Sequence, residues 1–214
     1  MAGIVPAIIG QNFSEIEEKI KLLERWTDWV HLDIMDGTFT DQKSWRTPDD
    51  LELFDAKIDV EVHLMVEKPE TVLGNWIHMV DQVIVHVEAT EYLEKTLDYF
   101  TLGAATGGLA INLNTPIAVL EPWLQNVKLV QLMAIAEIGE QGHPFDERVL
   151  EKIKILRSKH PNVKIQIDGG VNLVNAEKLI AAGADNLVVG SAIWQSPDPI
   201  AALKKFYAFT RRQN

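Results

Sequence analysis

The stretch from residue 163 to residue 189 reads VKIQIDGGVNLVNAEKLIAAGADNLVV and indicates how the whole chain folds. Its two ends are short apolar runs rich in Val and Ile, which predict strands over residues 163–167 and 186–189. The amphipathic segment between them predicts a helix over residues 173–182, and Gly183 is placed to cap its C-terminal end. The stretch therefore predicts a βαβ unit, in which a helix joins two parallel strands.

The same alternation of short apolar runs and longer amphipathic segments recurs along the chain. Eight strands are predicted, over residues 3–9, 29–35, 58–65, 82–87, 107–112, 128–133, 163–167 and 186–189. Eight helices are predicted to follow them, over residues 14–26, 48–54, 70–79, 91–100, 116–123, 146–160, 173–182 and 198–210. Ser14 and Glu17 predict a capping box at the first helix.

The number and length of these units favour one fold over another. Each unit averages about 27 residues, and eight units in 214 residues lie near the lower size limit of a closed (β/α)₈ barrel, the TIM barrel. An open, doubly wound sheet is the alternative. No linker-like tract divides the chain, so we expect a single TIM-barrel domain over residues 1–214.

Composition and charge narrow the class of protein. With 47% apolar and 24% charged residues, the chain has enough apolar material for a sizeable core. The net charge of −11 disfavours non-specific binding to nucleic acid or to an anionic membrane surface. The opening segment MAGIVPAIIG lacks the basic region of a signal peptide and is too short to span a bilayer, so a cytoplasmic protein is expected.

Four side chains near predicted strand ends have the chemistry of metal ligands. In a TIM barrel the catalytic groups lie at the C-terminal ends of the strands. His31 and Asp33 share one face of the second predicted strand, His63 lies near the end of the third, and Asp168 follows the seventh. Two imidazoles and two carboxylates suit a Zn²⁺, Fe²⁺, Mn²⁺ or Co²⁺ site with a position open for substrate. The alternative is that each His is an ordinary hydrogen-bonded residue.

The last two strand-to-helix junctions are rich in glycine. Gly169 and Gly170 follow the seventh predicted strand, and Gly190 and Ser191 follow the eighth. Barrels often bind phosphate with the backbone of these two loops, and glycine allows a close approach. The sequence therefore predicts a phosphate site there, although glycines after a strand also occur in ordinary turns.

Three methionines and one further histidine end strands without an evident role. From the pattern alone, Met35, Met65 and Met133 are interpreted as residues that fill gaps in the core, with an apolar lid over the reacting atoms as the alternative. His86 ends the fourth predicted strand and is interpreted as a buried, hydrogen-bonded histidine. The absence of cysteine excludes disulfides and thiolate metal sites.

Seven short segments carry a resemblance to a known family. They are HLDIMDG (31–37), VHLMV (62–66), VHVE (85–88), LNTP (113–116), IDGGV (167–171), AGAD (182–185) and VGS (189–191). Their content and order, over nearly the whole chain, resemble the ribulose-phosphate 3-epimerase family. The resemblance implies a TIM barrel of the ribulose-phosphate-binding type.

The resemblance also implies roles for individual side chains. Four of them would be the ligands of one divalent metal ion: His31, Asp33, His63 and Asp168. Two of these would also be the catalytic proton-transfer groups, Asp33 and Asp168. The side chains that cap the intermediate would be Met35, Met65 and Met133. The substrate and its phosphate would contact His63, Gly139, Gly142, Gly169, Gly170, Gly190 and Ser191.

The implied activity is metal-dependent 3-epimerisation, an isomerase reaction of the pentose phosphate pathway that interconverts D-ribulose 5-phosphate and D-xylulose 5-phosphate. Proton removal at C3 gives an enediolate, and a second carboxylate returns a proton to its opposite face. The alternatives are a 3-epimerase of another ketose phosphate, such as a hexulose phosphate, and a non-catalytic sugar-phosphate-binding protein. The resemblance further implies a homo-oligomer with a small-molecule substrate and neither nucleic acid nor membrane as a partner.

The chain departs from the family pattern in three loops. Gly10 stands where a substrate-contacting serine is expected after the first strand, and residues 38–45 differ from the usual loop after the second. Residues 137–145 replace a glycine-rich loop, and they place Glu140 where a phosphate dianion is expected. That carboxylate would weaken phosphate binding unless it points away or His143 compensates for it. These departures predict an altered grip on the substrate.

Overall fold

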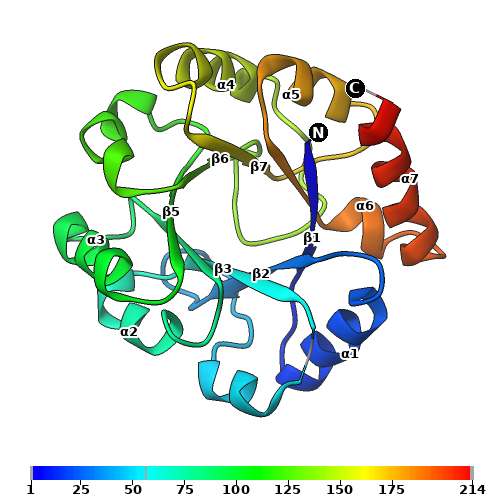
Figure 1. The fold of residues 1–214 in the computed structure, drawn as a ribbon, viewed down its shortest axis with the longest axis horizontal. Coiled ribbons are helices and arrows are strands. Elements are labelled where there is room, and N and C mark those ends of the chain that lie inside the picture. The colour runs from blue at the N-terminus through cyan, green and yellow to red at the C-terminus, as the bar shows by residue number, and fades with distance from the viewer. Residues whose placement is uncertain (1, 56, 213–214) are drawn as a thin grey trace.

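Eight parallel strands close into a barrel, and the helices form a ring around it (Figure 1). The structure is a computed structural model that describes residues 2–55 and 57–212. Its strands are β1 (Gly3–Ile8), β2 (Trp29–Met35), β3 (Asp59–Met65), β4 (Gln82–His86), β5 (Thr106–Ile111), β6 (Leu129–Met133), β7 (Lys164–Asp168) and β8 (Asn186–Val189). Because β1 also pairs with β8, the predicted (β/α)₈ TIM barrel is confirmed and the open sheet is excluded.

The helical segments connect one strand to the next on the outside of the barrel. The α-helices of the described residues are α1 (Phe13–Leu23), α2 (Leu73–Trp76), α3 (Leu93–Leu102), α4 (Arg148–Lys159), α5 (Ala176–Ala182), α6 (Ser191–Trp194) and α7 (Pro199–Arg212). The 3-10 helices are η1 (Pro48–Leu53), η2 (Pro69–Thr71), η3 (Ile117–Val119) and η4 (Glu121–Asn126). Within the described ranges, no helix combines the length and apolar character needed to cross a membrane.

The strands lie where the sequence predicts them, with ends that differ by at most one residue. Several helices differ more. The capping box at α1 is centred on Asn12 and Glu15 instead of Ser14 and Glu17, because Asn12 Oδ1 accepts the Glu15 N–H at 3.1 Å and Glu15 Oε2 accepts the Gln11 N–H at 2.9 Å. The predicted cap at Gly183 is confirmed, since its φ of +116° is in the left-handed region that favours glycine.

Two predicted helices are broken into shorter pieces. The segment predicted over residues 70–79 forms η2 and α2, with the weak helix formers Thr71 and Val72 at the break. The segment predicted over residues 116–123 forms η3 and η4, because Pro122 has no N–H to continue a helix. Helix α6 has four residues and carries no periodic pattern from which it could be predicted.

The main hydrophobic core lies between the strands and the surrounding helices. Outward-facing strand residues such as Leu32, Leu64 and Ile167 are fully buried there against the helices. Inside the barrel, two small apolar groups form separate clusters, one around Val5 and Val188 and one around Ile84. The remaining interior is polar and histidine-rich, which is unusual for a buried core and marks the barrel interior as the place to search for a site.

Candidate metal centre and active site

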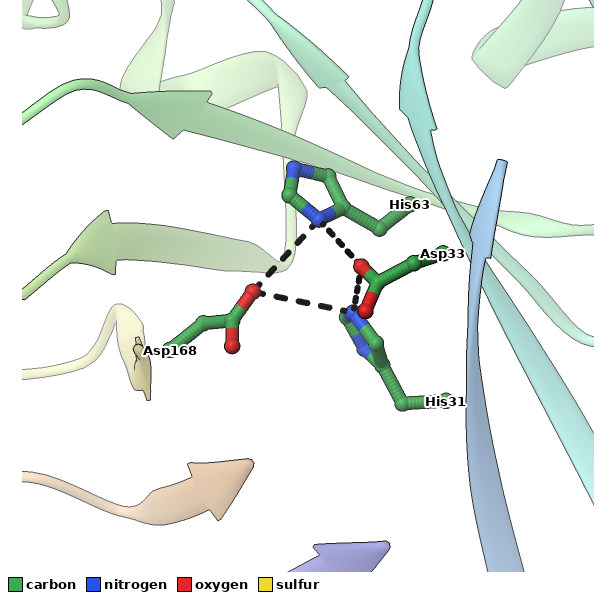
Figure 2. A group of neighbouring side chains, drawn as sticks. All are labelled: His31, Asp33, His63 and Asp168. Carbon is green, nitrogen blue, oxygen red and sulfur yellow. Dashed lines mark hydrogen bonds and ion pairs between the residues drawn. The ribbon is translucent and has the colours of Figure 1, made fainter. Parts of the chain in front are cut away.

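Four buried polar side chains converge at one point inside the barrel (Figure 2). His31 and Asp33 come from β2, and His63 comes from β3. Asp168 ends β7 and approaches the other three from the opposite side (Figure 2). The strand register explains the convergence, since Asp33 pairs with His63 in the β2–β3 ladder and the two-residue alternation brings His31 to the same face.

The four side chains can hold a divalent metal ion. Asp33 Oδ1 lies 3.2 Å from His31 Nε2 and 3.1 Å from His63 Nδ1. Asp168 Oδ2 lies 3.8 Å from His31 Nε2 and 3.5 Å from His63 Nδ1. One ligand atom from each residue lies within 4.8 Å of all the others, and all four residues are buried. Two imidazole nitrogens and two carboxylate oxygens form a donor set that fits Zn²⁺ and its divalent neighbours.

The charges in this cluster shift the pKa values of its members. Burial alone would raise the pKa of Asp33, but His31 and His63 lower it well below its usual range. Burial alone would lower the pKa of His31, but Asp33 and Glu61 raise it well above 6.5. The pKa of His63 is also raised against the effect of burial, by Asp168 and Asp33. The carboxylates thus favour positive charge on the imidazoles, a charge that a divalent cation would supply instead.

A second layer of buried polar side chains lies below the cluster. Glu61 Oε1 accepts a hydrogen bond from His31 Nδ1 at 2.6 Å and one from Gln166 Nε2 at 2.6 Å. Gln131 Nε2 lies 3.1 Å from both His63 Nδ1 and Asp168 Oδ2. Sequence reasoning missed these roles, although Gln131 and Gln166 stand two positions and Glu61 four positions before a strand-end residue, so that each faces the same way as that residue.

His86 and Glu88 extend the network on the other side of His63. His86 Nε2 lies 2.8 Å from His63 Nε2, and His86 Nδ1 lies 3.2 Å from Glu88 Oε2. His86 is fully buried, so its interpretation as a buried, hydrogen-bonded histidine is confirmed. Although burial would raise it, hydrogen bonds chiefly from His86 lower the pKa of Glu88 to about 2. Glu88 is therefore a carboxylate at neutral pH and accepts hydrogen bonds only.

A cleft opens over the cluster at the C-terminal ends of the strands. Its walls include ten of the residues that the sequence indicates for the site: Asp33, Met65, Met133, Gly139, Gly142, Asp168, Gly169, Gly170, Gly190 and Ser191. His31, His63 and Met35 are not among the residues that line it, and all three are almost completely buried. The cleft thus has two carboxylates at its base and glycine-rich backbone at its rim.

The three loops that depart from the family pattern have distinct positions. Gly10 lies outside the cleft, and a Cβ atom there would come within 2.6 Å of Ile16; β1 instead contributes Ala7 to the cleft wall. The other two loops contact each other, since Gln42 Nε2 donates to Glu140 Oε1 at 2.5 Å. Glu140 Oε2 also lies 3.7 Å from His143 Nε2, so both oxygens of this cleft-lining carboxylate have partners.

Comparisons with known proteins agree with the fold and indicate one family. The family model described as the ribulose-phosphate 3 epimerase family matches residues 3–194. A chloroplastic ribulose-5-phosphate-3-epimerase of Arabidopsis thaliana is 34% identical, over 97% of this chain and 77% of the plant protein. A ribulose-phosphate 3-epimerase of Bacillus subtilis (strain 168) is 30% identical, over 96% of this chain and 98% of the bacterial protein.

Solved structures confirm the fold alone. A crystal structure of 3-hexulose-6-phosphate synthase superposes with a TM-score of 0.74 at 18% identity, over 97% of this chain and 99% of that one. An orotidine 5'-monophosphate decarboxylase from Sulfolobus solfataricus superposes with a TM-score of 0.65 at 12% identity, over 99% of both chains. These two proteins are named for different activities yet share this barrel, so fold likeness does not identify the reaction.

Fold and site together define a TIM-barrel enzyme whose buried His and Asp side chains can hold a divalent metal ion at the base of a cleft. The chain belongs to the ribulose-phosphate 3-epimerase family, and it is an isomerase of the epimerase class.

Proposed function

We propose that this protein interconverts D-ribulose 5-phosphate and D-xylulose 5-phosphate by proton transfer at C3. The observation that carries the proposal is the placement of two carboxylates, Asp33 and Asp168, at the base of one cleft and on opposite sides of one cluster (Figure 2). Inversion at a carbon that passes through a planar intermediate requires one group on each face. A pair of carboxylates from β2 and β7 meets that requirement.

In the forward reaction, one carboxylate takes the C3 proton and the electron pair of the C–H bond moves onto the C2 carbonyl, giving an enediolate. The carboxylic acid on the other side then returns a proton to the opposite face of C3. For the reverse reaction the two groups exchange roles. The imidazoles of His31 and His63 lie beside Asp33 and lower its pKa, which keeps it in the carboxylate form that the group taking the proton needs.

A divalent ion held by His31, Asp33, His63 and Asp168 would stabilise the negative charge on the enediolate oxygens as a Lewis acid. The chain's own contribution is to orient this donor set. Glu61 accepts a hydrogen bond from His31 Nδ1 at 2.6 Å and leaves His31 Nε2 facing Asp33 and Asp168. Such a carboxylate–histidine pair fixes the orientation of a ligand imidazole.

The glycine-rich rim is suited to the phosphate of the substrate. Gly190 is the N-cap of α6, which begins at Ser191, and Gly169 and Gly170 follow β7 on the same cleft wall. Gly169 and Gly170 have φ values of +104° and +65°, a backbone region that favours glycine and can turn N–H groups toward an anion. Backbone donors would bind the phosphate without an arginine cluster. Met65 and Met133 line the cleft beside the carboxylates and would cover the apolar face of the intermediate.

A hexulose phosphate is the second candidate substrate, because two of the loops that depart from the family pattern, 38–45 and 137–145, contact each other through Gln42 and the cleft-lining Glu140. Turnover of D-ribulose 5-phosphate and of D-allulose 6-phosphate by one metal-loaded preparation separates the two. A kcat/KM at least about tenfold higher for the pentulose phosphate, equivalent to about 1.4 kcal/mol in transition-state binding, supports the proposal. A preference for the hexulose phosphate would replace it, and binding of both without turnover would indicate a sugar-phosphate-binding protein.

A further inference from the structure

The tautomer of His63 decides whether this residue can bind a metal ion. Its Nδ1 faces Asp33 and Asp168, whereas its Nε2 faces away from the cluster (Figure 2). A neutral imidazole carries one hydrogen, and only the nitrogen without it can donate a lone pair to a cation. His63 is therefore a ligand through Nδ1 only if its hydrogen resides on Nε2.

The amide side chains on the Glu61 side allow that tautomer. Gln166 Nε2 donates to Glu61 Oε1 at 2.6 Å. The second hydrogen of that NH₂ then donates to Gln131 Oε1 at 2.9 Å. This leaves the NH₂ of Gln131 facing His63 Nδ1 and Asp168 Oδ2, each at 3.1 Å, so Nδ1 has a donor beside it when it carries no hydrogen.

The hydrogen bonds on the Glu88 side require that tautomer. Glu88 Oε2 can only accept, so His86 carries its hydrogen on Nδ1, 3.2 Å away. His86 Nε2 is then without a hydrogen and accepts from His63 Nε2 at 2.8 Å. Two imidazole nitrogens at this distance form a hydrogen bond only if one of them carries a hydrogen. The Glu88 end of the network thus places a hydrogen on His63 Nε2, and the Gln131 end is compatible with an Nδ1 that carries none.

We propose that Glu88 is a positioning residue that acts through His86 to hold His63 in the tautomer whose Nδ1 is free for a divalent metal ion. Glu88 touches neither the cleft carboxylates nor the ligand nitrogens, and it acts over two hydrogen bonds. The inference rests on the proposed function, because it assumes that His63 is a ligand.

The substitution Glu88→Gln reverses the direction of the two hydrogen bonds that join residue 88 to His63 through His86, and it keeps the shape of the side chain. Glu88 Oε1 accepts from the Asn112 N–H at 2.8 Å and from the Thr115 hydroxyl at 2.5 Å, and these donors would hold the amide oxygen of Gln in the same place. The amide NH₂ would therefore face His86 Nδ1 and donate to it. His86 would then carry its hydrogen on Nε2, and His63 would be left with its hydrogen on Nδ1, where the cation binds.

We expect Glu88→Gln to weaken Zn²⁺ binding, measured by chelator competition, on the order of 10- to 100-fold. Glu88→Ala distinguishes an effect of the tautomer from an effect of the charge, because it removes the same negative charge but supplies no hydrogen-bond donor to His86. It should weaken Zn²⁺ binding less than Glu88→Gln does. Glu91→Gln is the matched control, because Glu91 is exposed near the same strand end and pairs with Lys68 at 3.3 Å; it should bind Zn²⁺ as the natural protein does. Thermal unfolding of each variant verifies folding.

Nitrogen-15 spectra of the imidazoles report the tautomer directly. In the Zn²⁺-loaded natural protein the hydrogen of His86 should be on Nδ1, and in Glu88→Gln it should be on Nε2. Unchanged Zn²⁺ affinity in Glu88→Gln, or an equal loss of Zn²⁺ affinity in Glu88→Gln and Glu88→Ala, would contradict the proposed role of Glu88. If the natural protein binds no divalent ion, both this proposal and the proposed function are wrong. If the natural protein binds Zn²⁺ and turns over substrate, and Glu88→Gln binds Zn²⁺ as Glu91→Gln does, only the proposed role of Glu88 is wrong.

Discussion

Asp33 stands directly opposite His63 in the β2–β3 ladder, and Asp33 Oδ1 lies 3.1 Å from His63 Nδ1. Strand register alone creates this contact between a candidate proton-transfer group and a candidate metal ligand. A slip of one residue between β2 and β3 would turn one of the two side chains out of the barrel. The chemistry of the site is therefore built into the pairing of the sheet.

Asp168→Asn tests the second carboxylate. The amide keeps the size of the side chain and an oxygen that accepts from Gln131 Nε2, so the variant should fold. An amide cannot carry the proton, and we expect kcat to fall on the order of 10²- to 10⁴-fold. Asp146→Asn is the matched control, since Asp146 pairs with Arg148 at 2.8 Å outside the cleft. Near-natural activity of Asp168→Asn would contradict the two-carboxylate mechanism.

Removal of metal tests the buried donor set. Exhaustive chelation should abolish epimerisation, and Zn²⁺, Fe²⁺, Mn²⁺ or Co²⁺ should restore it, because imidazole and carboxylate ligands accept several divalent ions. An ion that binds only the folded state also stabilises it, so Tm should rise by about 5–10 °C at an ion concentration of ~100 Kd. Full activity of protein shown by elemental analysis to contain no metal is incompatible with this site.

Gly190→Ala tests the phosphate rim. The three atoms nearest to a Cβ atom at this position all belong to the side chain of Gln141, the closest at 2.6 Å, and the φ of −100° is not in the left-handed region that favours glycine. The variant should fold, but its methyl group would fill space beside Ser191 and raise KM about tenfold, equivalent to about 1.4 kcal/mol. Gly74→Ala on α2, whose Cβ would lie 3.3 Å from Tyr99, is the control. An unchanged KM would place the phosphate elsewhere.

Lys152 predicts a pH dependence of stability. Its ammonium group is half-buried and donates to the carbonyl oxygens of Asn112 and Thr115, and burial lowers its pKa to about 8. Between pH 8 and about 10.5 the unfolded chain holds a proton that the folded chain lacks, so the free energy of unfolding rises with pH. The free energies of unfolding of the natural protein and of Lys152→Met, measured with urea, should therefore differ by an amount that shifts in favour of the natural protein between pH 7.5 and 9.5. A constant difference would contradict the lowered pKa.

Local sequence patterns were sufficient to predict the barrel and the four clustered side chains. Alternation of apolar and polar residues in β2 places His31 and Asp33 on one face, and the rule that active sites lie at strand ends adds His63 and Asp168. The tautomer network was not predictable in this way. Glu61 and Gln166 meet at 2.6 Å although they are 105 positions apart in the sequence, and only the closed barrel brings them together.

The contacts of the loops also could not be predicted from the sequence. The contact between Gln42 and Glu140 joins loops 98 positions apart, and no periodic pattern specifies it. The position of Gly10 shows the same limit, since its place after β1 suggested a role in the cleft that the packing of Ile16 excludes. Side-chain direction in an irregular segment depends on tertiary packing, which local patterns do not encode.

The central claim is proton transfer at C3 of a ketose phosphate, and hydrogen exchange tests it most directly. D-Ribulose 5-phosphate in D₂O is incubated with protein of known metal content, and NMR follows both the C3 proton and the formation of D-xylulose 5-phosphate. We predict deuterium at C3 together with epimerisation, and neither in metal-free protein. Metal-loaded protein that gives neither exchange nor epimerisation would contradict the claim.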